Sequence, residues 1–269
     1  MVKKVVAIMF FLMLEQALFA GWVIIQKNTD PKGVVINETI YLQKNILKQV
    51  SKNITIIFDV NLQKITLISD EKKVFFTGTT KDFKAEVIKI ANVKFQEMIK
   101  NASADKKASY EAAFKEQMKA YDSPSNDKNA SKVVVKLTKE VISVLSFKAS
   151  KYQVFVNDKL KMDIWLSDKF ITNVEFDVGK FLKLSGDLNL LTKNKYKASE
   201  EYIKMMKKGY ALKTIEYASK GNTEIQVVSS VQKNLNAADL GIPAGYKKAA
   251  LGEILNAVSY THLTLPTKA

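Results

Sequence analysis

The chain of 269 residues lacks cysteine and arginine altogether and has a single histidine. Without cysteine it cannot form a disulfide, a thiolate metal site, a cysteine nucleophile or a cysteine-linked lipid anchor. Arginine supplies the planar, bidentate contacts on which sequence-specific nucleic-acid readers depend, so we expect no nucleic-acid partner. These absences exclude several classes of enzyme and reader before any motif is considered.

The charge is strongly one-sided, because 42 basic residues, all of them lysine, stand against 27 acidic ones and give a net charge of +15. Lysine alone can still attract anionic lipid or phosphate in a salt-dependent, non-specific way. We expect either a solvated lysine-rich surface or weak contact with an anionic membrane surface.

The N-terminus, MVKKVVAIMFFLMLEQALFAGW, is typical of an export signal. Lys3 and Lys4 precede an apolar run, Val5 to Leu14, and the small residue Ala20 offers a cleavage site. The run is too short to span a bilayer, although an uncleaved anchor is the alternative. We expect residues 1–20 to be a signal peptide cleaved near Ala20, and the mature chain to be a soluble periplasmic protein without a lipid anchor.

Residues 22–79 are strand-like. In the segment 53–60 the apolar residues alternate with polar ones, and the segments 64–70 and 73–79 follow after short polar breaks. From 81 to 121 the apolar residues adopt helical spacing, weakened near 101–107, and 121–132 has the polar, proline-containing composition of a linker. The pattern predicts an antiparallel meander followed by a helical insert of one long or two consecutive helices.

Strands return in the segments 133–137 and 141–147 and in a hairpin over 151–167, which turns at Asn157-Asp158. Helical patterns follow at 176–191 and 198–209, the second with Ser199 as its N-cap. Two more strands precede a strand-like IPAGYKK and a short helix, ALGEILNA. Strands interrupted by helices at two points favour one α+β domain over residues 21–257, with an antiparallel sheet.

Motifs for catalysis are scarce. The chain has no G-x-G-x-x-G, P-loop, H-E-x-x-H or G-x-S-x-G pattern, and the S-x-x-K at Ser103–Lys106 has no K-[ST]-G partner. We therefore expect no enzyme, no catalytic residue, no cofactor and no metal. The acidic series does not fit a calcium loop and is expected to serve turns and caps; its members are Asp163, Asp168, Glu175 and Asp177. Trp165 is expected to pack beneath a helix or, alternatively, to line a ligand cleft.

The lone histidine, His262, lies in the last twelve residues, VSYTHLTLPTKA. Back-translated, Val258 to Thr267 resembles, codon for codon, one reading frame of the transposase mosaic-end adapter used to prepare sequencing libraries. We therefore interpret 258–269 as a non-native tail and His262 as no functional residue. A genuine strand-forming tail is the alternative.

Several segments together resemble the bacterial family called domain of unknown function 4412. These are the hairpin KYQVFVNDKLKMDIWLS, the strand pair GYALKTIEY…TEIQVVSS, the closing IPAGYKK and the insert SYEAAFKEQMKAY. The family is similar to periplasmic lipoprotein carriers of the outer-membrane localisation type. That resemblance implies a curved antiparallel sheet, an unclosed half-barrel, with helices plugging its concave face. The carriers depend on an arginine beneath the lid, which this chain lacks, so their gating does not carry over.

The resemblance implies an apolar cavity that binds a lipid, an acyl chain or another hydrophobic ligand without catalysis. A filled core and a structural or protein-interaction role in the cell envelope remain the alternative, since any half-buried sheet alternates in the same way. An enzyme is the third possibility. The inward residues expected to line the cavity are Ile56, Phe58, Leu67, Phe76, Val154, Val156, Met162, Ile164 and Val227.

Overall fold

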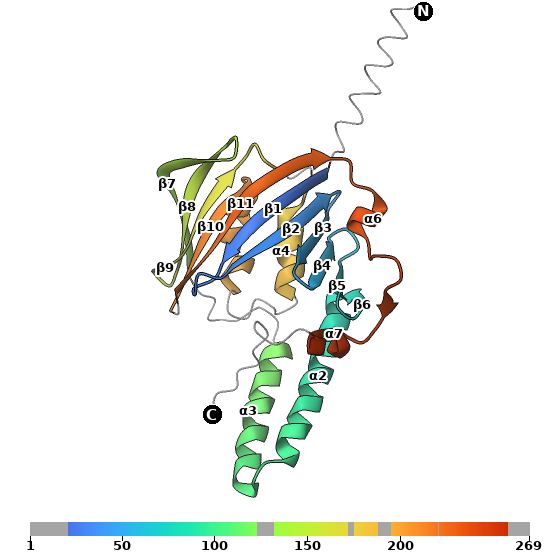
Figure 1. Cartoon of the computed structure of the whole chain (residues 1–269). Coiled ribbons are helices and arrows are strands. Elements are labelled where there is room, and N and C mark those ends of the chain that lie inside the picture. Colours follow the sequence, from blue (N-terminus) through green and yellow to red (C-terminus); the bar gives the residue numbers. More distant parts are fainter. Residues whose placement is uncertain (1–20, 123–131, 172–174, 188–194, 220, 258–269) are drawn as a thin grey trace, which may run out of the picture.

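The computed structural model describes residues 21–122, 132–171, 175–187, 195–219 and 221–257. The predicted signal peptide, most of the predicted linker and the predicted non-native tail with His262 lie outside these ranges. The described residues form one open, curved sheet with helices, so the α+β class is confirmed (Figure 1).

The strands follow the chain in two blocks. The first block consists of β1 (Gly21–Thr29), β2 (Val35–Gln43), β3 (Ile46–Ser51), β4 (Ile54–Asp59), β5 (Lys64–Ser69) and β6 (Val74–Thr79). The second block consists of β7 (Val133–Val144), β8 (Phe147–Val156), β9 (Lys159–Ser167), β10 (Tyr210–Ala218) and β11 (Gly221–Lys233). A two-residue strand, β12 (Lys247–Lys248), comes last.

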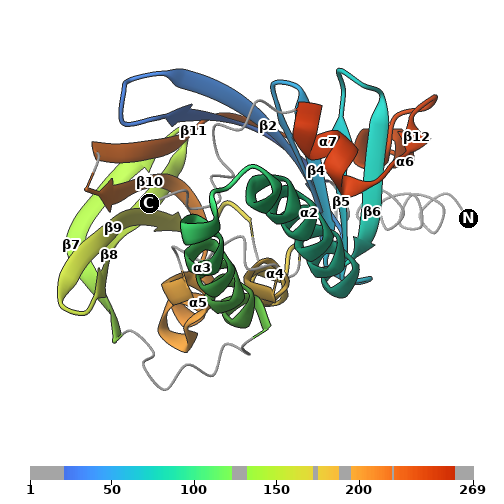
Figure 2. The same cartoon turned by 90° about the horizontal axis from the view of Figure 1, so that it is seen from below.

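Each block is an antiparallel meander, and the pairing of β1 with β11 joins the two into one sheet. The strand order is β12-β6-β5-β4-β3-β2-β1-β11-β10-β9-β8-β7, and β12 runs parallel to its neighbour β6. The sheet curves into an arc (Figure 2), and because the first and last strands of this order do not pair with each other, the arc stays open.

The predicted hairpin over 151–167 is confirmed as β8 and β9. Its turn residues Asn157 and Asp158 have φ values of 49° and 62°, the left-handed conformation that a tight two-residue hairpin turn requires.

The strand predicted at 133–137 and the first part of the one predicted at 141–147 form a single strand, β7, interrupted by a bulge between Leu137 and Val141. The polar residues Thr138, Lys139 and Glu140 within the bulge interrupt the apolar pattern, so the sequence predicts two strands where the structure has one. The predicted end of the second strand was wrong, because the chain turns at Leu145 and Ser146 and Phe147 begins β8.

Helices occupy the connections. The two blocks are connected by α2 (Thr80–Lys100) and α3 (Ala104–Asp122). The connection between β9 and β10 contains α4 (Val178–Asp187), the 3₁₀ helix η1 (Lys195–Ala198) and α5 (Glu200–Met206). After β11 come α6 (Ala237–Leu240) and α7 (Leu251–Ala257). None of the helices in the described ranges combines the length and the apolar character that a membrane crossing requires.

Local sequence explains where the helices begin. Thr79 and Asp82 form a capping box at the start of α2, and the Ser199 hydroxyl accepts a hydrogen bond from the Tyr202 amide as predicted for α5. The insert is two helices, which pack through Phe95 and Phe114, with ring centroids 4.0 Å apart. This helical hairpin extends away from the sheet (Figure 1).

Residues 234–257, here called the C-terminal strap, pass from one face of the sheet to the other. Lys48 of β3 donates to the Gly241 carbonyl at 3.0 Å, and the Leu235 amide donates to Gln43 at 2.9 Å. The strap then adds β12 to the edge of β6 and buries Leu251 and Ile254 of α7 completely in the core. The strap is therefore integral to the fold.

Candidate functional site

The nine predicted ligand-lining residues all lie on one face of the sheet. The strand register aligns Ile56 with Leu67 and Leu67 with Phe76, and it aligns Val154 with Met162 in the second block. We call this the helix face, because Phe181 of α4 packs edge-on against Phe58 at 5.1 Å. The opposite side is the outer face.

Most of these nine residues are covered by helices. Phe58, Leu67, Phe76 and Val227 belong to a core cluster that includes Leu251 of α7. The second block has its own cluster, in which Val154, Met162 and Ile164 pack with Tyr202 and Met205 of α5.

The other two, Ile56 and Val156, are half-buried beside these clusters. The sequence therefore predicted the face correctly, but these positions mainly form packed core.

A cavity of about 350 Å³ lies between the helix face and the α4–α5 connection. Its floor is formed by the central strands β3, β2, β1, β11 and β10, which contribute Gln49, Leu47, Ile40, Gln26, Ile225, Thr214 and Ala211. None of the nine predicted residues lines it. Its volume is at the low end of the roughly 300–1,000 Å³ that small-molecule sites occupy.

The opposite wall of the cavity is mainly apolar. α4 contributes Val178, Phe181 and Leu182, and α5 contributes Met206. Phe176 and Ile171, both buried, close the wall between β9 and α4. Apolar walls with a few polar groups are typical of sites for small hydrophobic ligands.

Charged residues mark the solvent-exposed end of the cavity. Asp168, Lys207 and Lys208 line it and are exposed, and the Lys208 ammonium lies 5.3 Å from the centre of the Tyr152 ring. Gly209 follows at a point where a Cβ atom would come within 2.4 Å of the Ser167 carbonyl oxygen. Only glycine allows this turn to press so closely on the end of β9.

A second hollow, of about 400 Å³, lies between β6 and α2. It is lined by Phe76, Thr77, Asp82, Ala85, Glu86 and Lys248. Phe76 is the one predicted ligand residue that touches it. Its half-polar lining gives a hydrophobic ligand less to contact than the cavity beneath α4.

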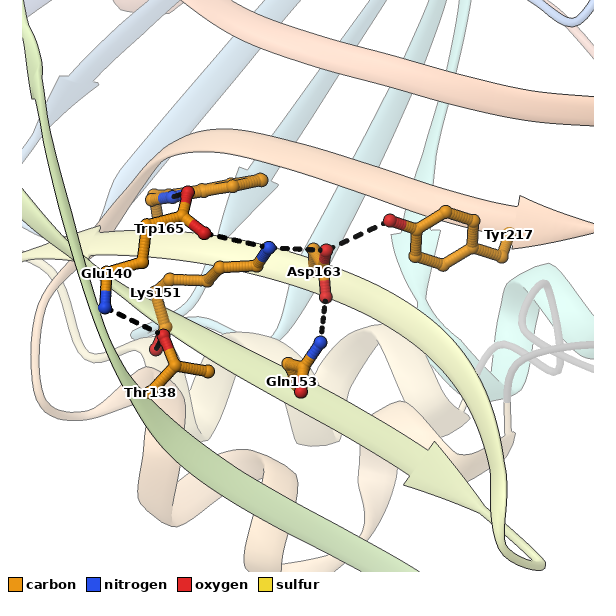
Figure 3. Close-up of polar contacts among 7 residues, drawn as sticks. All are labelled: Thr138, Glu140, Lys151, Gln153, Asp163, Trp165 and Tyr217. Atoms are coloured by element: carbon orange, nitrogen blue, oxygen red, sulfur yellow. Dashed lines mark hydrogen bonds and ion pairs between the residues drawn. The ribbon is translucent and has the colours of Figure 1, made fainter.

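A polar cluster lies on the outer face of β7 to β10 (Figure 3). The Lys151 ammonium bridges the Asp163 carboxylate at 2.9 Å and Glu140 at 3.1 Å. Asp163 also accepts hydrogen bonds from the Tyr217 hydroxyl at 2.9 Å and from Gln153 at 3.2 Å. The hydrogen bond to Asp163 raises the pKa of Lys151 above its ordinary value.

Trp165 is part of this outer cluster and does not line the cavity. Its indole Nε1 donates to Glu140 at 3.0 Å, and the ammonium groups of Lys151 and Lys213 lie 4.9 and 5.6 Å from the ring centre. The residue is only 5% exposed and belongs to the same hydrophobic cluster as Val144 and Ala149, so apolar neighbours as well as these polar groups bury it. The outer cluster ties the β7 bulge to three other strands through mutually satisfied charges.

The acidic series does not converge on one site. Asp177 caps α4 by accepting from the Lys180 amide at 3.0 Å, as predicted, and Glu175 accepts from the Trp22 indole at 3.2 Å. Asp168 is exposed, whereas Asp163 is a mid-strand residue and the prediction of a turn or cap was wrong for it. Ser103 is exposed between α2 and α3, outside any described cavity.

Sequence reasoning missed the cavity floor. Gln26 and Gln49 lie at inward positions of β1 and β3, and neither strand alternates apolar and polar residues, so their sequences carry no signal that these glutamines face inward. The sequence also did not predict that α4 forms a wall of the cavity, because the position of a helix over a sheet depends on tertiary packing.

No family model matches the chain, and no curated protein matches it. Among solved structures, two crystal forms of PNGF-II are similar at 10% and 11% identity, with TM-scores of 0.39 and 0.37. These matches cover 88% of this chain and 32% and 33% of PNGF-II, so the chain spans about a third of that protein. A structure of MucB is similar at 9% identity with a TM-score of 0.35, covering 86% of this chain and 60% of MucB. Likenesses this weak carry no inference about function.

Proposed function

We propose that the chain is an exported periplasmic protein that binds a lipid or another hydrophobic ligand in a half-barrel and catalyses no reaction. The observation that carries the proposal is the cavity of about 350 Å³, with its apolar wall from α4 and α5. The resemblance to the domain of unknown function 4412 and to lipoprotein carriers, stated above on sequence motifs, leads to the same class of ligand.

The proposal includes helices that plug the concave face of the sheet. α4 and α5 lie within the arc in Figure 2, and Phe181 packs on Phe58, which supports this arrangement. The site residues are then those of the cavity rather than the nine core positions. Burying an acyl chain against such a wall is favourable by about 25 cal/mol per Å² of apolar surface.

The first test is native mass spectrometry of a chain that carries the signal and ends at Ala257, isolated from the periplasm without detergent. A discrete extra mass that organic extraction removes is the expected result. The variant Ala211→Trp fills the cavity floor and should lose this mass, whereas Val228→Trp, at a site 43% exposed, should retain it.

A bare chain that stays bare after incubation with envelope lipids would contradict ligand binding. The second candidate function is then an interaction module of the cell envelope. The observation that favours it is the α2–α3 hairpin, which presents Val93 and Met98 at 55% and 43% exposure. Crosslinking from these two positions to an envelope protein, in place of a bound lipid, is the outcome that distinguishes it.

A further inference from the structure

A polar strip crosses the floor of the otherwise apolar cavity. It consists of Gln26 of β1, Gln49 of β3 and Thr214 of β10. In the sheet order β3-β2-β1-β11-β10, Gln26 is central, and the other two lie two strands away on either side. A ligand consisting of hydrocarbon alone would leave Gln49, Thr214 and the Gln26 Oε1 without a partner, which is costly for polar groups removed from water.

The hydrogen-bonding state of the strip favours a ligand with donors. The Gln26 amide nitrogen donates to Glu38 at 2.6 Å, and since a carboxylate only accepts, the Gln26 Oε1 remains to accept from a ligand. Gln49 and Thr214 make no side-chain hydrogen bond within the described residues, and none of the polar side-chain atoms described there is both buried and unpaired. Their polar atoms therefore reach the solvent of the cavity.

The charges near the strip disfavour an anion. Glu38 is 9% exposed and neighbours Gln26 across the β1–β2 pair, so its carboxylate would repel a negative head group placed on the strip. The lysines that could attract an anion, Lys207 and Lys208, lie at the exposed end of the cavity beside Asp168.

We propose that the ligand is an amphiphile with an uncharged, hydroxyl- or amide-bearing head group, which hydrogen-bonds to Gln26 and to one of its two flanking partners in the strip, Gln49 or Thr214. Its apolar tail contacts Ile40, Leu47 and Phe181. This inference rests on the proposed function and specifies the class of ligand.

The test is displacement of the fluorescent probe N-phenylnaphthylamine by two ligands with the same acyl chain, monolauroylglycerol and laurate, at neutral pH. The glyceride carries two hydroxyl donors and no charge, whereas laurate is an anion. We expect the glyceride to compete at least about tenfold more tightly than laurate. Of the variants Gln49→Leu and Thr214→Val, the one on the side that the head group occupies should weaken the glyceride about 5- to 10-fold, the loss expected for a neutral hydrogen bond.

Neither substitution orphans an intramolecular partner, so both variants should fold, and binding of the apolar probe should be unchanged. The matched control is Gln226→Leu on the outer face of β11, which should not alter the competition. Competition by laurate equal to or better than the glyceride, or glyceride affinity unaffected by both Gln49→Leu and Thr214→Val, would overturn the head-group assignment alone. Failure of the probe and both lipids to bind would overturn the proposed function itself.

Discussion

The Asp163 carboxylate on the outer face is held by Lys151, Tyr217 and Gln153, and it is only 6% exposed. We expect Asp163→Asn to lower the free energy of unfolding by about 2 kcal/mol, because the Lys151 ammonium loses its closest anionic partner in a desolvated cluster. Urea unfolding followed by tryptophan fluorescence measures the change. The control Asp168→Asn, at a side chain 70% exposed, should change stability by less than about 0.5 kcal/mol. Equal effects of the two variants would contradict a stabilising role for the cluster.

The side chain of Tyr202, a residue of α5, is buried in the core, and this burial raises the pKa of its hydroxyl above the ordinary value. Above pH 10 the unfolded chain releases this proton while the folded chain retains it, so stability falls by about 1.4 kcal/mol per pH unit for each such tyrosine. Below pH 10 the contribution is fully present. Tyr202→Phe should therefore flatten the decline in stability between about pH 10 and pH 11, measured by urea unfolding at each pH. A decline as steep as in the parent chain would rule out Tyr202 as a cause.

At this scale the sequence predicted which face of a strand each of the nine expected lining residues occupies, but not what covers it. Ile56 and Gln49 are cross-strand neighbours on the helix face, yet one adjoins packed core and the other lines the cavity. Period-two alternation determines the face alone. The difference arises from where α4, α5 and α7 rest on the sheet, which no local pattern encodes.

At the scale of elements, the strap depends on two fully buried residues of a seven-residue helix, α7. Ile254→Ala should destabilise the protein by about 2–4 kcal/mol, since it removes buried methylene groups and leaves a cavity between α7 and the sheet. Thermal or urea unfolding measures this loss. Glu253→Ala, an exposed neighbour on the same helix, is the matched control and should have little effect. If Ile254→Ala lowered the free energy of unfolding only slightly, the packing of α7 on the sheet would not contribute to stability.

The helical hairpin is expected to be locally weak. α3 is held to α2 by the stacked rings of Phe95 and Phe114, and none of the α3 residues whose side chains are described, 105–116 and 118, is buried. Phe114→Ala should raise hydrogen exchange across α3 at least about tenfold, while the midpoint of global unfolding changes little. Hydrogen-exchange mass spectrometry reports both helices separately. An equal rise in the strands would show that the hairpin and the sheet unfold together.

Elements with strong periodicity or clear caps were predictable, and short ones were not. The α5 cap at Ser199 and the β8–β9 turn followed from local chemistry, and so did the final helix near 250–257. The strand-like IPAGYKK contains only the two residues of β12. α6 and β12 are set by contacts to the sheet from residues nearly 200 positions away, including the Lys48–Gly241 hydrogen bond, and their own sequences carry little signal.

For the whole molecule, the net charge of +15 rests entirely on lysine. We expect vesicles containing phosphatidylglycerol to bind the protein at about 0.01 M salt and to release it near 1 M, because the screening length falls from about 30 to 3 Å. Sedimentation with phosphatidylcholine vesicles is the control and should show no binding. Persistent association at high salt would point to insertion of apolar side chains in place of charge attraction.

The pairing of β1 with β11 has a consequence for the order of folding. Val23 lies opposite Val231, about 200 residues further along the chain, whereas the other antiparallel pairs join strands that are consecutive in the sequence. The first block and the β7–β8–β9 unit can therefore form early from short turns, whereas β10 joins β9 across the α4–α5 connection, and the β1–β11 seam must wait for the longest loop to close. Until then the edges of β1 and β11 that face each other are unpaired. During synthesis from the N-terminus, the six strands of the first block are complete before β11, the partner of β1 at the centre of the sheet, has been made.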